Sequence, residues 1–217
     1  MAGVTGMARH RTPLIVGTAV LFIAALCAVG CKAAFPMAIN QATVPGVIRD
    51  SLYQTHNIPG SPSTSSYSGI KWFVYESRGD DWLVASTATE FSTSGSGSGA
   101  SSSVLLWQVA LCSDPPADQT ELDVLTKMTG ALGGPGTRPS DFQAKDGSIL
   151  PGTDSGIICA GGIAFDRKIV EVVGVVVGGE VRTAPVNGFW FMTHEGGTGW
   201  LEFRALDRNG KVLYTVQ

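Results

Sequence analysis

The sequence VLLWQVALC, from Val104 to Cys112, is too apolar for a strand that has one face in water. A half-exposed antiparallel strand alternates hydrophobic and polar residues, whereas a strand buried on both faces is a nearly continuous hydrophobic run. Gln108 is the only residue of this run outside the hydrophobic class. The run therefore predicts a buried central strand, and the neighbouring segments are interpreted around it.

Two strands are predicted before this run. Residues 70–76 (IKWFVYE) and 82–87 (WLVAST) are rich in β-branched and aromatic residues, and they are separated by a turn sequence that contains Gly79 and Asp80. Residues 92–103 consist of Ser, Gly, Thr and Ala. This composition favours a flexible loop, so we expect a hairpin, a loop and then the central strand.

One helix is predicted after the central strand, near residues 119–129. Asp118 and Glu121 have the spacing of a capping box, and Gly130 would end the helix. Apolar residues between them recur at roughly helical spacing, namely Leu122, Val124, Leu125 and Met128. The following segment, residues 133–156, is rich in Gly, Pro and Asp and is expected to be a loop.

The last 60 residues predict a β-meander. Gly178-Gly179 and Asn209-Gly210 supply the positive φ angles that tight hairpin turns need. Six strands are expected, over residues 157–165, 169–177, 180–185, 189–193, 200–206 and 211–216. The predicted fold class is mainly β, an antiparallel β-sandwich or partly closed barrel that follows an N-terminal membrane helix.

A basic flank and an apolar run at the N-terminus have the pattern of a membrane-targeting segment. Arg9 and Arg11 precede the uncharged residues 14–31, which would span about 27 Å as a helix. The sequence thus divides into a cytoplasmic flank (1–13), a transmembrane signal anchor or signal peptide (14–31), a stalk (32–68) and an extracytoplasmic β-domain (69–217). Cleavage by an ordinary signal peptidase, with release of the domain, is a further alternative.

Lipid attachment is the third outcome for this segment. Residues 28–31 (AVGC) resemble a bacterial lipobox, which would make Cys31 the acylated residue. A lipobox usually has Leu three residues before its cysteine, and Ala28 stands there. Alternatively, Cys27 and Cys31 are small hydrophobic residues within a membrane helix.

The predicted stalk is interrupted by proline and contains few long apolar patterns. Residues 60–66 (GSPSTSS) have the composition of a linker. Within the stalk, residues 44–53 are compatible with a short helix. Four prolines interrupt the segment, namely Pro36, Pro45, Pro59 and Pro62.

The predicted exported part is acidic. The chain has 15 basic and 18 acidic residues, and Arg9, Arg11 and Lys32 lie in the leader, which leaves 12 basic and 18 acidic residues, a net charge of −6. This charge argues against nucleic acid as a partner and against adhesion to anionic lipid. We expect contact with the membrane through the N-terminal segment and with an envelope protein or glycan through the domain.

Cys112 and Cys159 are the only cysteines after the leader. In an oxidising compartment two such thiols favour a disulfide, which would stabilise the fold by about 4 kcal/mol through loop closure. A metal site is less well supported, because the chain has neither a CxxC motif nor a neighbouring pair of histidines.

The C-terminal strands carry a resemblance. The blocks GIAF (162–165), VEVV (170–173), GEVRTAPV (179–186), GFWF (188–191) and ALDRNGKVL (205–213) occur in this order. The arrangement is similar to the C-terminal half of many membrane-anchored or secreted actinobacterial proteins of unknown function, in which a Trp and two Cys occupy the places of Trp72, Cys112 and Cys159. The Ser/Gly insert at 92–103 departs from that pattern. The resemblance implies an extracytoplasmic β-rich protein and brings no catalytic residues.

Motifs for catalysis and metal binding are incomplete. A zinc-protease HExxH motif would need a second histidine where Thr198 follows His194-Glu195. Residues 95–100 (GSGSGA) match a dinucleotide fingerprint only by composition, since no helix pattern follows. No Gly-x-Ser-x-Gly elbow is present. Asp80-Asp81 and Asp207 with Asn209 offer oxygen ligands of the kind that calcium prefers, but turn formation alone explains both.

Two function classes remain. The first is a non-catalytic, membrane-tethered module that binds or supports an envelope component. Two outward-facing tryptophans among Trp72, Trp82, Trp107, Trp190 and Trp200 would give it a platform for sugar rings. The second is a carboxylate-dependent envelope hydrolase, similar to a glycoside hydrolase, that uses Asp166 or Glu195. No catalytic, cofactor-binding or metal-binding residue is predicted.

Overall fold

The structure is a computed structural model that describes residues 37–40, 43–53, 64–93, 101–113, 124–133, 140–147, 156–196 and 199–217. All of these belong to one compact unit, Phe35–Gln217. The predicted membrane segment, residues 14–31, and its Cys31 lie outside the described residues. Within the described part of the chain, no helix has the length and apolar character needed to cross a membrane.

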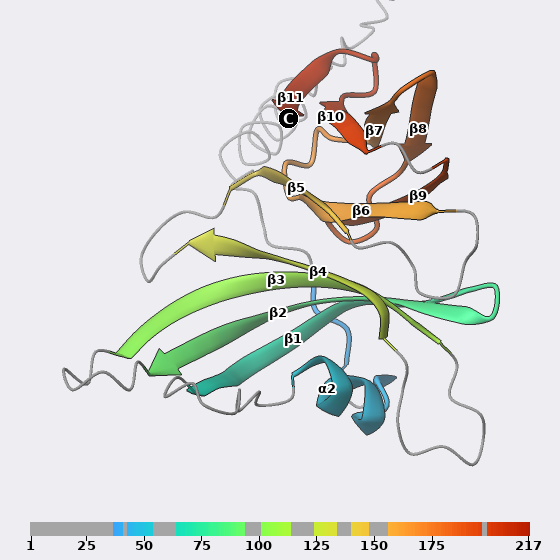
Figure 1. The fold of residues 1–217 in the computed structure, drawn as a ribbon. Coiled ribbons are helices and arrows are strands. Elements are labelled where there is room, and N and C mark those ends of the chain that lie inside the picture. Colours follow the sequence, from blue (N-terminus) through green and yellow to red (C-terminus); the bar gives the residue numbers. More distant parts are fainter. Residues whose placement is uncertain are drawn as a thin grey trace, which may run out of the picture. The chain divides into compact units, whose positions relative to one another are not determined.

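Antiparallel strands make up most of the described chain (Figure 1). One short helix, α2 (Gly46–Leu52), precedes them. The strands are β1 (Thr64–Arg78), β2 (Asp81–Thr93), β3 (Ser101–Ser113), β4 (Val124–Gly133), β5 (Phe142–Asp146), β6 (Ile157–Ala164), β7 (Glu171–Val176), β8 (Gly179–Thr183), β9 (Phe189–Glu195), β10 (Trp200–Leu206) and β11 (Val212–Val216).

These strands form three open sheets. Sheet 1 has the order β1-β2-β3-β4, sheet 2 the order β5-β6-β9, and sheet 3 the order β11-β10-β7-β8. The prediction of a mainly β, antiparallel fold is confirmed. Within the described chain the strands are divided among three sheets, and they do not form a closed barrel.

Three hydrophobic clusters hold the layers together. The first joins sheet 1 to sheet 2 and contains Trp107, Val109, Ile163 and Phe189. The second joins sheet 2 to sheet 3 through Phe142, Trp190, Val172 and Phe203, among others. The third packs α2 on the other face of sheet 1 through Ile48, Leu52, Trp72, Val84 and Ala110. Sheet 2 is therefore covered on both faces, which explains why β6 is buried along nearly its whole length.

The predicted central strand is confirmed as β3, which lies between β2 and β4. Its side chains alternate between the two faces of sheet 1. Trp107 and Val109 enter the cluster shared with sheet 2, whereas Ala110 and Cys112 enter the cluster under α2. Both faces of β3 are covered, and this is why its sequence lacks polar alternation.

The helix predicted near residues 119–129 was wrong over its described part, which is strand β4. Along β4, Thr126, Met128, Gly130 and Leu132 are buried and the residues between them are exposed. This is a period of two, the period of a strand with one face in the core. The helical interpretation relied on the spacing of four apolar residues, whereas two β-branched threonines and Gly130 disfavour a helix here.

Part of the predicted stalk belongs to the compact unit. Ile48 and Leu52 lie one turn apart on α2, and with Val44, which precedes the helix, they are buried against sheet 1. The short helix predicted for this region is therefore confirmed as α2. The backbone N–H of Ile39 donates to the carbonyl of Trp72 at 2.8 Å. The predicted boundary at residue 69 was therefore too late, because the prolines of this segment concealed its amphipathic pattern.

Two predicted loops contain strand residues. β5 lies within the region expected to be a loop after Gly133. At the Ser/Gly tract, β2 continues to Thr93 and β3 begins at Ser101, and the hydroxyls of Ser92 and Ser102 lie 2.8 Å apart. Residues 94–100 lie outside the described chain. Cross-strand pairing thus extends the hairpin into residues with weak strand propensity.

The six C-terminal strands are all present, but they do not form one meander. β6 and β9 belong to sheet 2, while β7, β8, β10 and β11 belong to sheet 3. Local turn residues specify hairpins such as β7–β8 and β10–β11. They do not specify long-range pairs such as β6–β9, which divide the segment between two layers.

A buried tryptophan connects sheets 1 and 2. The indole of Trp107 is inaccessible to solvent, and its Nε1–H donates to Oε1 of Gln143 on β5 at 2.6 Å. The amide nitrogen of Gln143 in turn donates to the carbonyl of Ala131 on β4 at 2.9 Å. Gly130 lies opposite Trp107, and a Cβ atom there would stand 2.4 Å from the indole Nε1. The absence of a side chain at Gly130 makes room for the ring.

We predict that Gly130→Ala lowers the free energy of unfolding by about 1–3 kcal/mol, because the added methyl group overpacks the buried indole. Gly179→Ala is the matched control, since nothing lies within 4 Å of a Cβ at Gly179. That change should stay within about 0.5 kcal/mol. Urea unfolding of the two variants and the parent measures both effects. Equal stabilities for the two variants would contradict the close approach at Gly130.

Candidate functional site

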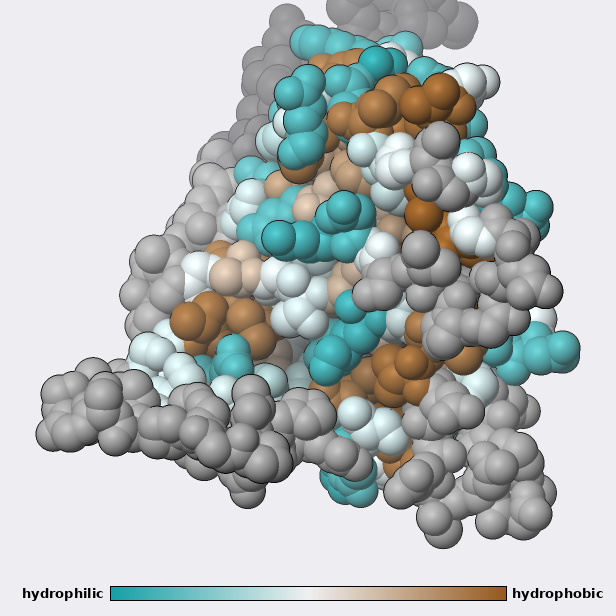
Figure 2. Space-filling view, in the orientation of Figure 1, coloured by the Kyte–Doolittle hydropathy of each residue, from teal (hydrophilic) through white to brown (hydrophobic). Residues whose placement is uncertain are grey.

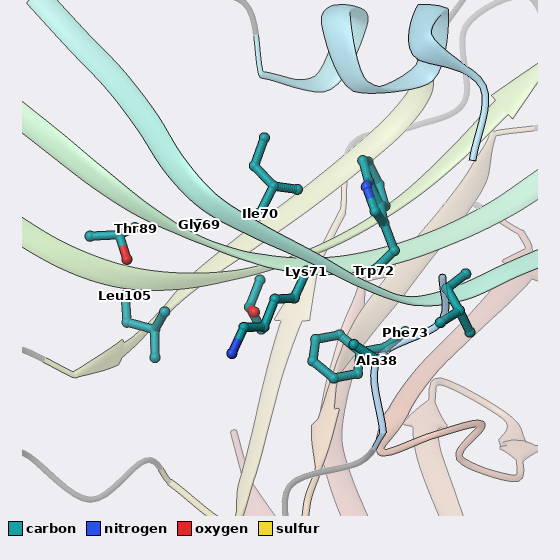
Figure 3. A pocket seen from close by; sticks show the side chains of 10 residues that line it. Ala38, Gly69, Ile70, Lys71, Trp72, Phe73, Thr89 and Leu105 are labelled. Carbon is teal, nitrogen blue, oxygen red and sulfur yellow. The ribbon is translucent and has the colours of Figure 1, made fainter. Parts of the chain in front are cut away.

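A pocket of about 690 Å³ lies on sheet 1, over strands β1–β3. Its volume falls within the range of about 300–1,000 Å³ that is typical of small-molecule sites. Among the described residues it is lined by Ala38, Ile39, Gly69, Ile70, Lys71, Trp72, Phe73, Thr87, Thr89 and Leu105. Figure 3 shows these side chains from close by.

Strand register places the functional groups of the pocket on one face. Lys71 is the cross-strand partner of Thr87, and Thr89 is the partner of Leu105. Thr87 in turn pairs with Trp107, whose ring faces sheet 2. The pocket thus opens on the face of sheet 1 that packs against sheet 2. In Figure 3, Lys71, Phe73 and Leu105 extend from one side of the sheet, and Ile70 and Trp72 extend from the other.

Irregular pairing at one edge of sheet 1 shapes the pocket. The register of β1 against β2 shifts between Ser68 and Lys71 and again between Trp72 and Val74. Gly69, at the first shift, has a φ of 61°, which glycine adopts at low cost. Such bulges bend a strand and redirect its side chains. The hydrogen bond from Ile39 to Trp72 holds Ala38 and Ile39 against this edge.

The chemistry of the pocket is that of binding. Phe73 and Leu105 supply apolar surface, Thr87 and Thr89 supply hydroxyls, and Lys71 supplies one positive charge. None of the described lining residues is an acid, a histidine or a cysteine. The described lining therefore lacks the pair of titratable groups on which general acid–base catalysis depends.

The structure separates the two carboxylates considered for catalysis. Asp166 follows the C-terminal end of β6, where its Oδ1 accepts from the backbone of Lys168 and its Oδ2 from the hydroxyl of Tyr214. Glu195 pairs with Ile157 at the other end of β6. Eight strand residues separate them, about 26 Å. Glycoside hydrolases need two carboxyl groups within about 5–10 Å, so these two do not form such a pair.

His194 lies in strand β9. Its ring is 6.1 Å from the ring of Trp200. The carboxylate of Asp207 stabilises a turn, and no calcium ion is needed to explain it. Its Oδ1 accepts hydrogen bonds from the backbone N–H of Asn209 and of Lys211, and these bonds lower the pKa of Asp207. Within the described ranges, no three His, Cys, Asp or Glu side chains gather as a metal site.

The tryptophans do not form the expected platform of two exposed rings. Trp72, Trp107 and Trp190 are at most 2% exposed. Trp200 is half-buried, and its Nε1–H donates to the carbonyl of Cys159 at 3.1 Å. Trp82 is also half-buried and stacks on Tyr75, with ring centroids 4.5 Å apart and planes 16° apart. Four of the five rings thus serve the packing of the layers.

The predicted disulfide between Cys112 and Cys159 is not formed in the structure, where both are buried free thiols. Cys112 belongs to the cluster under α2, on one face of sheet 1. Cys159 lies in sheet 2, against Thr126. Thr126 belongs to the opposite face of sheet 1, because it alternates in phase with Met128 of the first cluster. A disulfide requires Cα atoms within about 7 Å and facing side chains.

Burial also makes both thiols unreactive. It raises the pKa of Cys112 to about 12 and that of Cys159 to about 11, and the hydroxyl of Thr126 partly offsets the second increase. The thiolate is the form that attacks electrophiles and binds metals. Neither cysteine is therefore a candidate nucleophile at neutral pH.

Charged groups on the outer face of sheet 3 pair with one another. Arg182 donates to Glu171 at 2.9 Å and to Glu180 at 2.7 Å. Arg204 binds Glu180 at 3.4 Å and also pairs with Glu202. Val173 on β7 is the cross-strand partner of both Arg182 on β8 and Arg204 on β10. It is only 1% exposed, because the aliphatic stems of arginine side chains can cover apolar surface. On the face drawn in Figure 2, hydrophilic residues divide the hydrophobic ones into separate patches.

The pocket residues carried no motif in the sequence. The alternation of Lys71 with Ile70 and Trp72 does indicate that Lys71 and Phe73 share a face of the strand. The register that brings Thr87, Thr89 and Leu105 beside them becomes visible only in the fold.

We predict that the stability of the protein falls as pH rises from about 9 to 11, in part through Cys112. Its pKa is raised from 9.0 to about 12 in the folded protein, so in this interval the unfolded thiol loses its proton and the folded one keeps it. One such thiol lowers the free energy of unfolding by up to about 1.4 kcal/mol per pH unit. Cys112→Ala should therefore flatten this dependence.

Urea unfolding without reductant, at several pH values between 8 and 11, measures this slope for the parent, Cys112→Ala and Cys159→Ala. Each variant should have a flatter slope than the parent, because each lacks one buried thiol. A disulfide in the parent would give the opposite result, since either substitution would release a thiol and steepen the slope.

Comparison with known proteins identifies no relative: no protein-family model, no curated protein and no solved structure matches this chain.

Proposed function

We propose that this protein is a membrane-tethered, non-catalytic binding module of the cell envelope, and that its pocket over β1–β3 takes a small ligand with an apolar body. The observation that supports this proposal is the composition of the pocket. It combines apolar side chains, two hydroxyls and one ammonium group, and its described lining contains no acid or histidine. Ligand sites are commonly apolar with a few placed polar groups.

The alternative of a carboxylate-dependent hydrolase has less support. Asp166 is held by hydrogen bonds from Lys168 and Tyr214, and Glu195 lies at the far end of β6. Neither residue lines the pocket. A hydrolase would need a different pair of carboxylates, brought together in a cleft.

The tether is supported by the sequence pattern of residues 9–31. Basic residues before a long uncharged apolar run favour an N-terminus that stays in the cytoplasm and a domain on the other side of the membrane. Retention as a signal anchor and acylation of Cys31 are two versions of this tether, and cleavage with release of the domain is the alternative to a tether. The acidic composition of the domain favours partners other than nucleic acid.

We expect a protease added to intact spheroplasts to digest the β-domain, because the proposed topology places it outside the membrane. Metabolic labelling with palmitate then separates the versions of the tether. Label that is lost in Cys31→Ala supports lipidation, unlabelled protein in the membrane fraction supports the signal anchor, and protein in the medium supports cleavage. Protection of the domain until the spheroplasts are lysed would refute the topology.

We also expect the purified full-length protein to retain a component of an envelope extract from the producing cells, as detected by native mass spectrometry. Leu105→Trp should abolish retention by filling the pocket. Ala38→Trp, at an exposed position on the pocket wall, tests the same point with less risk to the core. Val177→Trp is the control, because Val177 is 64% exposed in the β7–β8 turn. Equal retention by all variants would exclude this pocket as the site.

A further inference from the structure

We infer that the pocket over β1–β3 binds a single-chain amphipathic anion, with its charged head group at Lys71 and its alkyl chain along Phe73 and Leu105. This inference rests on the proposed binding function and names the class of ligand. The shared chemistry is one anionic head group on one alkyl chain, as in a fatty carboxylate or an alkyl phosphate.

The charge of the pocket selects an anion. Lys71 is the only charged side chain among the described lining residues. Within the described part of the chain it forms no ion pair, whereas Arg182 and Arg204 are each bound to two carboxylates. In a protein with 18 acidic and 15 basic residues, Lys71 is thus a cation set apart from the acids. A cationic ligand would be repelled, and a neutral one would leave the ammonium group without a charged partner.

The hydroxyls beside Lys71 complement the same head group. Thr87 is the direct cross-strand partner of Lys71, so their Cβ atoms are about 4.5–5.5 Å apart. Thr89 lies two residues further along the same face of β2. A hydroxyl donates one hydrogen bond, and an ionised carboxylate or phosphate accepts several. Lys71 and Thr87 therefore provide two donors for one head group.

The remaining surface of the pocket suits an alkyl chain. Beyond the hydroxyls, the described pocket side chains on this face are those of Phe73 and Leu105 (Figure 3). Ala38 and Ile39 also line the pocket, at the edge of the sheet. A sugar or nucleotide of this size would place hydroxyl and amide groups against apolar carbon, where unpaired polar groups are costly. An alkyl chain has no such groups and gains about 0.8 kcal/mol for each buried CH₂.

The test uses the reactivity of Lys71 in the full-length protein, held in phosphatidylcholine nanodiscs. Lysines are reductively methylated at increasing concentrations of octanoate, nonanoate, decanoate or undecanoate, and the extent at each lysine is measured by peptide mass spectrometry. Lys168, which is exposed and does not line the pocket, is the internal control. Free carboxylate is measured in each sample, because the nanodisc also takes up alkyl chains.

We expect each carboxylate to protect Lys71 and leave Lys168 unaffected. The concentration for half-protection should fall about fourfold for each added methylene (~0.8 kcal/mol) until the pocket is filled. Decanol, which lacks the charge, should protect about tenfold less well than decanoate. Decyl phosphate is tested in the same way as decanoate. If decanoate protects Lys71 at the lower concentration, the ligand is a fatty carboxylate, and if decyl phosphate does, the ligand is an alkyl phosphate. Leu105→Trp and Ala38→Trp should each remove the protection.

Protection that is independent of chain length, equal at Lys71 and Lys168, or equal for decanol and decanoate would overturn the inference. Failure of the inference is distinguishable from failure of the proposed function. If the pocket-filling variants lose an envelope component but no amphiphile protects Lys71, the pocket binds a ligand of another class. If the parent retains nothing and no amphiphile protects Lys71, both proposals fail.

Discussion

The fold depends on the enclosure of one indole ring. Trp107 stands at the centre of sheet 1 with no access to solvent, and its N–H group therefore needs a partner within the protein. Gln143 on β5 accepts that hydrogen bond and donates to Ala131 on β4. Two sheets are thus joined by a polar bridge inside an otherwise apolar interface. The bridge requires β5 to lie over β3 and β4, and this position in turn determines where β6 can pair.

Close contacts extend this constraint into sheet 2. A Cβ atom at Gly162 on β6 would lie 2.0 Å from the carbonyl oxygen of the same Gln143. A Cβ atom at Gly130 on β4 would enter the indole of Trp107. Both glycines are needed because backbone and ring approach them closely. The ring of Trp107 and the backbone of Gln143 are thus each placed by steric fit within their own sheet, and the hydrogen bond between these two residues joins the sheets.

Strand sequences with strong local character were predicted well from sequence alone, and the assignment of strands to layers was not. β3 is recognisable because both of its faces are covered, and Asn209-Gly210 marks the β10–β11 hairpin. β4 was mistaken for a helix because its buried face includes Thr126 and Gly130, which do not register as hydrophobic. The expected disulfide failed for a related reason. Two cysteines in core strands can lie on opposite faces of one sheet, and sequence spacing does not reveal the face.

The candidate site follows from a difference in strand length between the layers. β1, β2 and β3 have 15, 13 and 13 residues, whereas the strands of sheet 2 have 5, 8 and 7. At about 3.3 Å per residue, even the 13-residue strands of sheet 1 are longer than the 8-residue β6, the longest strand of sheet 2, by about 17 Å. In the described chain, the apolar face of β3 is fully buried at Trp107 and Val109 but only partly at Leu105. Phe91, further along β2 on the same face, is 41% exposed. A sheet that continues past its covering layer leaves apolar surface open to a ligand, and Lys71 and Thr87 lie where that surface begins.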